Sequence, residues 1–269
     1  MTGTHKDTGR TALITGASSG IGEALAGRFA RGGYNLVLVA RSARKLQRLA
    51  RALSTSHGIK ASVAPADLSQ PEAARKLAAA MARAKRPIDV LVNSAGVLEY
   101  GNFIELSAAR HRRLIDLNVA GLTAMLAHFV PPMVARGTGR VLNVASIAAF
   151  QPLPSLATYA ATKAFVLSLT ESLAEELKGT GVTVTALCPG MTATNMLRSF
   201  RLSRRDLKLL PGFVVGSAEA VANEGYEACV RGEVIRVPGG LNLAAVFATR
   251  NTPRWLWRRV SGAMVRVIR

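Results

Sequence analysis

The sequence predicts an α/β protein with a doubly wound fold, in which a mostly parallel sheet of seven strands lies between two layers of helices. Short, branched and nearly all-apolar runs, such as TALIT (11–15) and NLVLVA (35–40), are typical of strands that are buried on both faces of a parallel sheet. Stretches with helical spacing of apolar residues separate these runs. The chain has 269 residues, which is enough for one large domain of this kind.

The predicted elements alternate between strand and helix along most of the chain. Strands are expected at 11–15, 35–40, 60–66, 88–93, 139–146, 181–188 and 234–238. Helices are expected at 20–31, 43–56, 70–84, 107–135, 154–178 and 217–231. No repeat, low-complexity tract or flexible linker interrupts this order. We therefore assign residues 11–240 to one domain, which follows an N-terminal arm at residues 1–10.

Two basic regions fall outside the alternation: an insertion at 191–212 and an arginine-rich tail at 241–269. The formal net charge is +19; no acidic residue occurs between 24 and 66, and seven arginines follow Glu233, the last acidic residue. Such a charge attracts phosphates, nucleic acid and anionic lipid alike, and it also suits simple solubility. The charge therefore indicates an anionic partner but does not identify it.

Cysteine content and hydropathy bear on metal binding and on the compartment. Cys188 and Cys229 have no CxxC partner and no neighbouring histidine, so we expect two buried thiols and no metal site. The polar start MTGTHKDTGR lacks the apolar core of a signal peptide. The best apolar run, Leu241–Ala248, is shorter than the ~18–20 residues of a membrane span. The expected location is the cytoplasm.

A glycine-rich loop, TGASSGIG (15–22), follows the first strand and precedes a helix. Glycine lets the backbone approach a pyrophosphate closely, and the helix N-terminus offers oriented N–H groups to the anion. The spacing differs from G-x-G-x-x-G, and three glycines can also form an ordinary turn. The order of strand, loop and helix favours a cofactor site, whose expected contacts here are Gly16, Ser18, Ser19, Gly20, Ile21 and Gly22.

The end of the second strand, VARSARK (39–45), predicts the form of the dinucleotide. In dinucleotide-binding folds an acid at this position accepts from the ribose 2′-OH of NAD, whereas an arginine suits the 2′-phosphate of NADP. Arg41 replaces the acid, and Ser42 can donate a further hydrogen bond. We therefore expect NADP(H) rather than NAD(H). The alternative, that the arginines form a solvated helix face, is preferred for Arg48 and Arg51.

Further motifs follow in a fixed order. They are NSAG (93–96), LNVAG with Asn118, NVAS ending in Ser146, YAATK (159–163) and CPGMTAT (188–194). With the glycine loop, this series resembles the classical short-chain dehydrogenase/reductase family over about residues 10–240; Ser94 departs from the family's NNAG element. Each motif alone is a weak signal, whereas their order together is specific.

The resemblance implies a Rossmann fold, an oxidoreductase and the roles of individual residues. Asp67 would contact the adenine, Asn93 and Gly96 would line the cofactor cleft, and Thr192 and Thr194 would hold the carboxamide side of the nicotinamide. The cofactor contacts that it implies beyond the glycine loop are Arg41, Ser42, Asp67, Leu68, Asn93, Ala95, Gly96, Tyr159, Lys163, Pro189, Gly190, Thr192 and Thr194.

The catalytic residues are predicted to be Ser146, Tyr159, Lys163 and Asn118. Tyr159 and Lys163 stand four apart, so on a helix both side chains lie on one face. A tyrosine can give the proton that a carbonyl oxygen needs as it becomes an alkoxide. The pKa of a phenol is about 10, and the Lys163 ammonium, with a charged nicotinamide, is expected to lower it. Ser146 would orient the carbonyl, and Asn118 would hold a water that links Lys163 to solvent.

The expected activity is that of an NADPH-dependent reductase that is reversible as an alcohol dehydrogenase. Val97, Leu98, Leu153 and Met191 surround the predicted site and favour a lipophilic carbonyl compound over a sugar. The insertion at 191–212 stands where the family carries a variable substrate lid. Its leucines and basic residues fit a substrate with an apolar body and an anionic handle, such as an acyl thioester, and fit an exposed basic helix equally well.

The expected partners are a small-molecule substrate and further copies of the chain. The resemblance implies a homodimer or homotetramer, paired through the helices at 107–135 and 154–178. The tail at 253–269 can be drawn as a helix with arginines opposite an apolar face, which indicates peripheral membrane contact through residues 250–269. Its apolar face could instead pack on the protein or a partner subunit. Nucleic acid is not expected, because no recognition motif accompanies the charge.

Two other classes of function stay open at this point. One is a cofactor-binding scaffold or sensor without turnover, against which the intact Ser146, Tyr159 and Lys163 argue. The other is a membrane-surface module whose main part is the basic tail.

Overall fold

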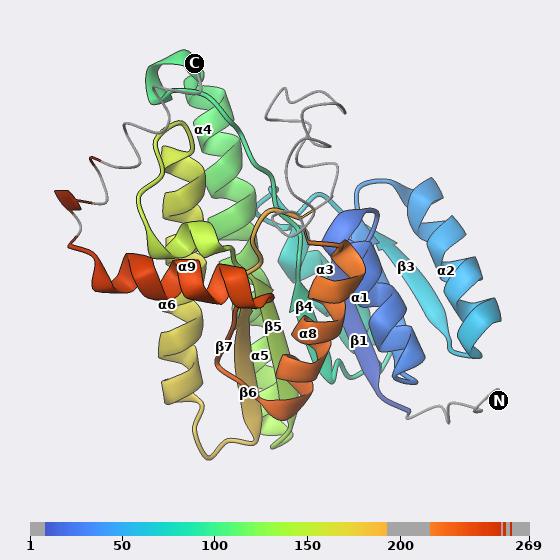
Figure 1. Cartoon of the computed structure of the whole chain (residues 1–269). Coiled ribbons are helices and arrows are strands. Elements are labelled where there is room, and N and C mark those ends of the chain that lie inside the picture. Colours follow the sequence, from blue (N-terminus) through green and yellow to red (C-terminus); the bar gives the residue numbers. More distant parts are fainter. Residues whose placement is uncertain (1–8, 193–215, 254, 257–258, 260–269) are drawn as a thin grey trace.

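The computed structural model describes residues 9–192, 216–253, 255–256 and 259, and these residues contain one sheet of seven parallel strands (Figure 1). The strands are β1 (Thr11–Thr15), β2 (Asn35–Ala40), β3 (Ala61–Pro65), β4 (Val90–Asn93), β5 (Gly139–Val144), β6 (Val182–Leu187) and β7 (Ile235–Arg236). Each lies within two residues of its predicted bounds. The predicted parallel sheet is therefore confirmed.

The order of the strands, β3-β2-β1-β4-β5-β6-β7, places a topological switch between β1 and β4. The chain builds outward from β1 to one edge of the sheet and then from β4 to the other edge. In sheets of this kind, ligands bind beyond the carboxyl ends of the strands at the switch. The fold thus predicts where the site lies.

Helices cover both faces of the sheet, as Figure 1 shows. One layer holds α1 (Gly20–Arg31), α2 (Ala43–His57) and α8 (Ala218–Arg231), and the other holds α3 (Ala73–Arg83), α5 (Leu122–Ala135) and α6 (Ala157–Glu176). Successive side chains of a strand point to opposite faces. Accordingly Leu13 and Ile14 of β1 are both fully buried but belong to different cores.

The predicted helix at 107–135 is not a single α-helix. α4 (Ala108–Ile115) passes into a π-helical turn, η2 (Asp116–Gly121), and only then into α5. Such turns occur mostly as local bulges within α-helices, often at functional sites. A Cβ atom on Gly121 would lie 2.3 Å from the carbonyl oxygen of Leu68, so this turn packs tightly against the loop that follows β3.

The segment Ala108–Ala135 is also long and apolar enough to cross a membrane by length and composition, with a mean hydropathy of 1.4 over its best window. Met125, Phe129 and Met133 of this segment are buried in the core on one face of the sheet. Core packing therefore explains its composition.

The region that the sequence predicts as a basic tail begins with a helix, α9 (Gly240–Asn251). Sequence analysis missed this helix because its residues are apolar on nearly every side and show no core-facing stripe. α9 packs on η3 (Ile147–Phe150), a short 3₁₀ helix directly after Ser146. The tail beyond it lies mostly outside the described residues.

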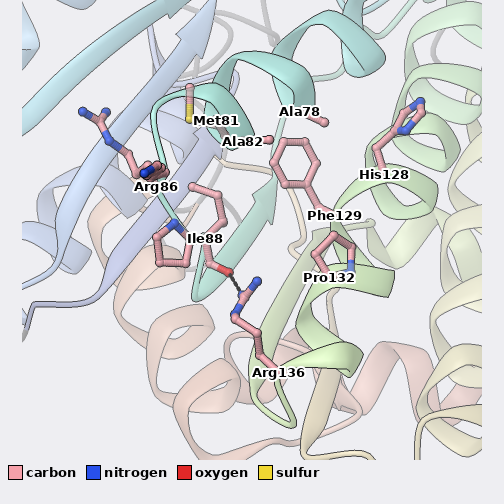
Figure 2. A pocket seen from close by; sticks show the side chains of 11 residues that line it. Ala78, Met81, Ala82, Arg86, Ile88, His128, Phe129, Pro132 and Arg136 are labelled. Atoms are coloured by element: carbon pink, nitrogen blue, oxygen red, sulfur yellow. Dashed lines mark hydrogen bonds between the residues drawn. The ribbon is translucent and has the colours of Figure 1, made fainter.

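A groove of about 200 Å³ lies between α3 and α5 (Figure 2). Ile88 and Phe129 line it, and Arg136 closes one end by donating to the carbonyl oxygen of Ile88 at 2.8 Å. Because Ile88 precedes β4, the groove lies at the amino end of the sheet, opposite to the end where such folds bind ligands. It is not the candidate active site.

Both cysteines are buried, as predicted. Burial raises the pKa of the Cys188 thiol and of the Cys229 thiol to about 12.

Candidate active site

The glycine loop follows β1 and packs tightly on the chain that follows β4. Gly16 has a φ of +68°, and a Cβ atom there would lie 2.7 Å from the carbonyl oxygen of Ser94. A Cβ atom on Gly22 would lie 2.4 Å from the carbonyl oxygen of Gly16. Both positions therefore require glycine, and together they hold the loop at the start of α1. The remaining predicted loop contacts, Ser18, Ser19, Gly20 and Ile21, lie at the same turn, with Ser19 at the N-cap.

Thr15, the last residue of β1, joins the two loops of the cleft. Its Oγ1 accepts hydrogen bonds from the backbone N–H groups of Ser94 and Ala95, both at 3.0 Å, and donates to the carbonyl oxygen of Val92 at 3.2 Å. Sequence analysis did not single out Thr15. A hydroxyl at the end of an otherwise apolar buried strand is the signal that could have found it.

Asn93 lies at the end of β4, as predicted, but its side chain points into the protein. Its Nδ2 donates to Oδ1 of Asn143 at 2.9 Å, and Nδ2 of Asn143 donates to Oγ1 of Thr170 at 3.0 Å. This buried chain of hydrogen bonds links β4, β5 and α6. The Asn93 side chain therefore positions the elements of the site, and sequence analysis missed its two partners.

The adenosine end of the predicted site lies beyond β2 and β3. Arg41 is exposed directly after β2, and Ser42 caps α2 by accepting from the backbone N–H of Lys45 at 3.5 Å. Asp67 accepts from the Ser69 hydroxyl at 2.8 Å. Burial acts to raise the pKa of Asp67, but hydrogen bonds from Ser69 and the charge of Arg41 outweigh it, so the pKa is lowered. Asp67 is thus an anion near Arg41, and Leu68 beside it is buried.

Ser146 and Tyr159 meet beyond the carboxyl end of β5. Ser146 precedes η3, and its Oγ accepts from the backbone N–H of Ala148 at 3.1 Å. Tyr159 lies in the first turns of α6 and shares a side-chain hydrogen bond with Ser146. Burial raises the pKa of Tyr159 to about 12, although the bond from Ser146 acts to lower it. At neutral pH the Tyr159 phenol is therefore protonated.

Lys163 lies one turn after Tyr159 on α6 and is almost fully buried. Its Nζ donates to the carbonyl oxygen of Val144 at 2.8 Å and lies 5.9 Å from the centroid of the Tyr159 ring. Burial lowers the pKa of Lys163 to about 8, although the neighbouring Cys188 acts to raise it. Without a cofactor, burial dominates the pKa of Tyr159 and Lys163 donates to the backbone, so the predicted lowering by this ammonium together with a charged nicotinamide stays a prediction.

Asn118 lies in the π-helical turn and reaches the same cluster. Its side chain pairs with the backbone of Val97 through two hydrogen bonds of 2.9 Å, and its Nδ2 also donates to Oγ1 of Thr162 at 3.2 Å. A Cβ atom on Gly96 would lie 3.3 Å from Oδ1 of Asn118 and 3.6 Å from Nζ of Lys163. Glycine at position 96 thus leaves room for both side chains. The water that Asn118 is predicted to hold stays a prediction.

The predicted nicotinamide segment follows β6. The backbone N–H of Ile147 donates to the carbonyl oxygen of Pro189 at 3.0 Å, and Oγ1 of Thr192 donates to the carbonyl oxygen of Gly190 at 3.1 Å. A Cβ atom on Gly190 would lie 2.3 Å from Oδ1 of Asn242, so α9 packs directly on this segment. Thr194 and positions 193–212 of the predicted lid lie outside the described residues.

An apolar wall lies beside Tyr159. Leu114, Ala148, Tyr159 and Ala160 form a small buried cluster. Partly buried apolar side chains pack against this cluster: Val97, Leu98, Leu153 and Leu156. The structure thus brings the predicted Val97, Leu98 and Leu153 together near the phenol.

We predict that kcat/KM for carbonyl reduction falls as the pH rises through about 8, because Lys163 then loses the charge with which it is predicted to orient cofactor and tyrosine. Unfolding is not the expected cause. The folded chain releases this proton at lower pH than the unfolded chain. The contribution of Lys163 to the free energy of unfolding therefore rises with pH between about 8 and 10.5. A pH profile of kcat/KM tests the expected fall in activity, and thermal melts at each pH test the expected rise in stability. A flat kcat/KM profile across pH 7–10 would contradict the role assigned to the charge of Lys163.

Comparison with known proteins agrees with this arrangement. The family model described as short chain dehydrogenase matches residues 10–205. The oxidoreductase UcpA of Escherichia coli K12 is 40% identical over 198 residues, which cover 72% of this chain and 73% of UcpA. Among solved structures, a short-chain dehydrogenase from Sphingobium yanoikuyae in complex with NADPH has a TM-score of 0.79 and 34% identity, over 96% of this chain and 95% of the other.

A structure of a 7β-hydroxysteroid dehydrogenase has a TM-score of 0.84 and 29% identity, over 94% of this chain and 96% of the other. The match of the family model, the UcpA similarity and the assembled motifs agree. The chain therefore belongs to the short-chain dehydrogenase family and is an oxidoreductase that acts on alcohol or carbonyl groups.

Proposed function

We propose that the protein is an NADPH-dependent reductase of a lipophilic ketone or aldehyde, with reduction as its working direction. The observation that carries this proposal is the buried Ser146–Tyr159 pair, which sets a protonated phenol beside a hydroxyl donor. A protonated phenol is an acid, and reduction is the direction that consumes a proton from the enzyme.

The residues of the cleft fit a nicotinamide dinucleotide. The glycine loop at the start of α1 has no room for a Cβ atom at Gly16 or Gly22, which suits a close approach of backbone to a pyrophosphate. Lys163 and Thr192 lie on the other side of the switch, where they would hold the nicotinamide end. The cofactor supplies the hydride for the carbonyl carbon.

The chain's own residues handle the carbonyl oxygen. The Ser146 hydroxyl donates a hydrogen bond to this oxygen and orients it, and Tyr159 gives its proton to the oxygen as negative charge develops there. Lys163 stabilises the tyrosinate that remains, because its ammonium lies one turn away on the same face of α6. The apolar wall near Tyr159 excludes water from the reacting atoms.

The preference for NADPH over NADH rests on Arg41. Arg41 lies directly after β2 and forms no ion pair with a carboxylate among the described residues, so its guanidinium can accept a 2′-phosphate. α2 adds its positive N-terminus and carries no acid in its first turn. The solved relatives include complexes with NADPH and with NAD, so the choice must be made on this chain's own residues.

Fluorescence titration tests the cofactor assignment. We expect NADPH to bind at least about tenfold more tightly than NADH, a difference of about 1.4 kcal/mol, and Arg41→Asp to erase this preference. Arg48→Asp makes the same change in charge on the exposed side of α2 and should keep the preference. Equal binding of NADH by the wild type would refute the phosphate assignment and turn the search toward NAD-linked alcohol oxidation.

The substrate class follows from the side chains around Tyr159. Val97, Leu98 and Leu153 offer apolar surface and no hydrogen-bonding side chain for the hydroxyls of a sugar. An acyl thioester remains one member of this class, since the basic residues of the predicted lid suit its anionic part. Turnover of a panel of aliphatic ketones, aldehydes and acyl thioesters with NADPH will rank them, and a preference for polyols would contradict the proposal.

We also expect a homodimer or homotetramer in the cytoplasm. α4 exposes Ile115 and α6 exposes Phe165, with 44% and 40% of their surfaces accessible. These two helices are those that the sequence predicts to pair with a second copy, and such exposed apolar side chains support that pairing. Light scattering in solution measures the assembly.

A further inference from the structure

The apolar residues that remain exposed are concentrated at the C-terminal end of the described chain. Leu241, Leu243 and Phe247 of α9 are 60%, 56% and 70% exposed, and Trp255 and Leu256 soon after it are 55% and 39% exposed. These five side chains fall within sixteen residues. We call these five side chains the α9 patch; exposed large apolar side chains concentrated in one segment are typical of an interaction surface.

Packing on the described part of the chain does not account for the α9 patch. On α9 only Val246 is a buried hydrophobic residue, and Asn242 is fixed by donating to the carbonyl oxygen of Pro238 at 2.7 Å. The helix thus rests on η3 and Gly190 through one narrow side. Its other sides carry leucine, alanine and phenylalanine to the surface. The helix that carries the patch therefore lies next to the candidate active site, and the side chains of the patch stay exposed.

The charged residues that follow β7 in the sequence have one sign. No acidic residue follows Glu233 in the sequence, whereas six arginines follow β7. Of these, Arg259 is exposed and lies 5.7 Å from the centroid of the Trp255 ring. Arg236 of β7, by contrast, is paired with Glu224 and Glu233. An apolar surface beside arginine and tryptophan has the character of a helix that lies in a membrane interface.

A second copy of the chain fits this surface less well. A symmetric dimer brings the same patch of both subunits together, so like charges such as Arg259 beside Trp255 would also be brought together. Each chain also carries a net charge of +19. An anionic lipid surface supplies the opposite charge.

We propose that the α9 patch docks the protein on the surface of an anionic lipid membrane. α9 has 12 residues and is about 18 Å long, which is too short to cross a bilayer core of about 30 Å, so it lies along the surface. This proposal does not depend on the reaction. If the proposed reductase activity is also correct, docking places the mouth of the site where a lipophilic carbonyl compound is concentrated.

Vesicle flotation of the full chain, without cofactor or substrate, tests the proposal. We expect the protein to float with vesicles of equal parts phosphatidylcholine and phosphatidylglycerol, to float poorly with phosphatidylcholine alone, and to be released by salt. Phe247→Glu should weaken binding by at least about tenfold. Ala52→Glu adds the same charge on the exposed side of α2, at the opposite edge of the sheet (Figure 1), and should bind like the wild type.

The proposal is overturned if the wild type stays with the soluble fraction, or if Phe247→Glu binds as tightly as Ala52→Glu. It is also overturned if Phe247→Glu dissociates an oligomer in light scattering without changing vesicle binding, since the patch would then contact a second copy. Circular dichroism confirms that both variants are folded. Because no turnover is measured, failure here leaves the proposed reductase activity untouched.

Discussion

Replacing Tyr159 with phenylalanine is expected to lower kcat about 10²–10⁴-fold while NADPH affinity changes less than about twofold. The substitution removes one oxygen atom, which shares a hydrogen bond with Ser146 in the wild type. The ring itself is buried and keeps its packing. The proton for the substrate oxygen is then missing, whereas the glycine loop and Arg41 are unchanged. Stopped-flow turnover and fluorescence titration measure the two quantities separately.

Tyr226→Phe is the matched control. Tyr226 of α8 packs in an aromatic cluster with Phe29 of α1 and with Tyr34, which directly precedes β2, so the cluster lies away from the carboxyl ends of the strands. Its loss of a hydroxyl should leave kcat nearly unchanged. If Tyr159→Phe also kept its turnover, another group would be the acid. If the variant kept cellular function without turnover, the cofactor-binding scaffold would become the better description.

The second large effect is expected from Gly22→Ala. The new Cβ atom would lie 2.4 Å from the carbonyl oxygen of Gly16, so the backbone of the loop must shift. We expect this overpacking to lower the free energy of unfolding by about 1–3 kcal/mol and the shifted loop to weaken NADPH binding by at least about tenfold. Chemical denaturation and titration of NADPH test the two effects.

Gly27→Ala in the same helix provides the comparison. A Cβ atom on Gly27 meets no atom within 4 Å outside the local helix and its chain neighbours. Alanine is a better helix former than glycine by about 0.8–1 kcal/mol, so this variant should be more stable than the wild type and bind NADPH normally. If Gly22→Ala and Gly27→Ala had the same free energy of unfolding and the same NADPH affinity, close packing of the loop would not be the reason for glycine at position 22.

The sequence predicts the sheet and most helices because the local patterns agree with the final packing. The apolar runs of β1 and β2 are fully buried on both faces, as their composition requires. The motif residues also converge as expected, since parallel strands end at one edge of the sheet. Ser146 after β5, Asn118 in η2, and Tyr159 and Lys163 on α6 thus meet in one cluster.

Other features depend on tertiary contacts that the sequence does not encode locally. The π-helical turn at Asn118 arises within a continuous helical pattern, where Gly121 packs against the carbonyl oxygen of Leu68. α9 has no core-facing stripe because little of it is covered. The pKa of Tyr159 without cofactor depends mainly on burial, which helical spacing does not reveal.

The two buried cysteines make the chain convenient for chemical labelling. Only the thiolate reacts readily with maleimides and oxidants, and a thiol with a pKa of about 12 is almost entirely protonated at neutral pH. The chain has no other cysteine. A cysteine introduced at Phe247 would therefore be the one reactive thiol, and a polarity-sensitive dye placed there would report whether that position leaves water.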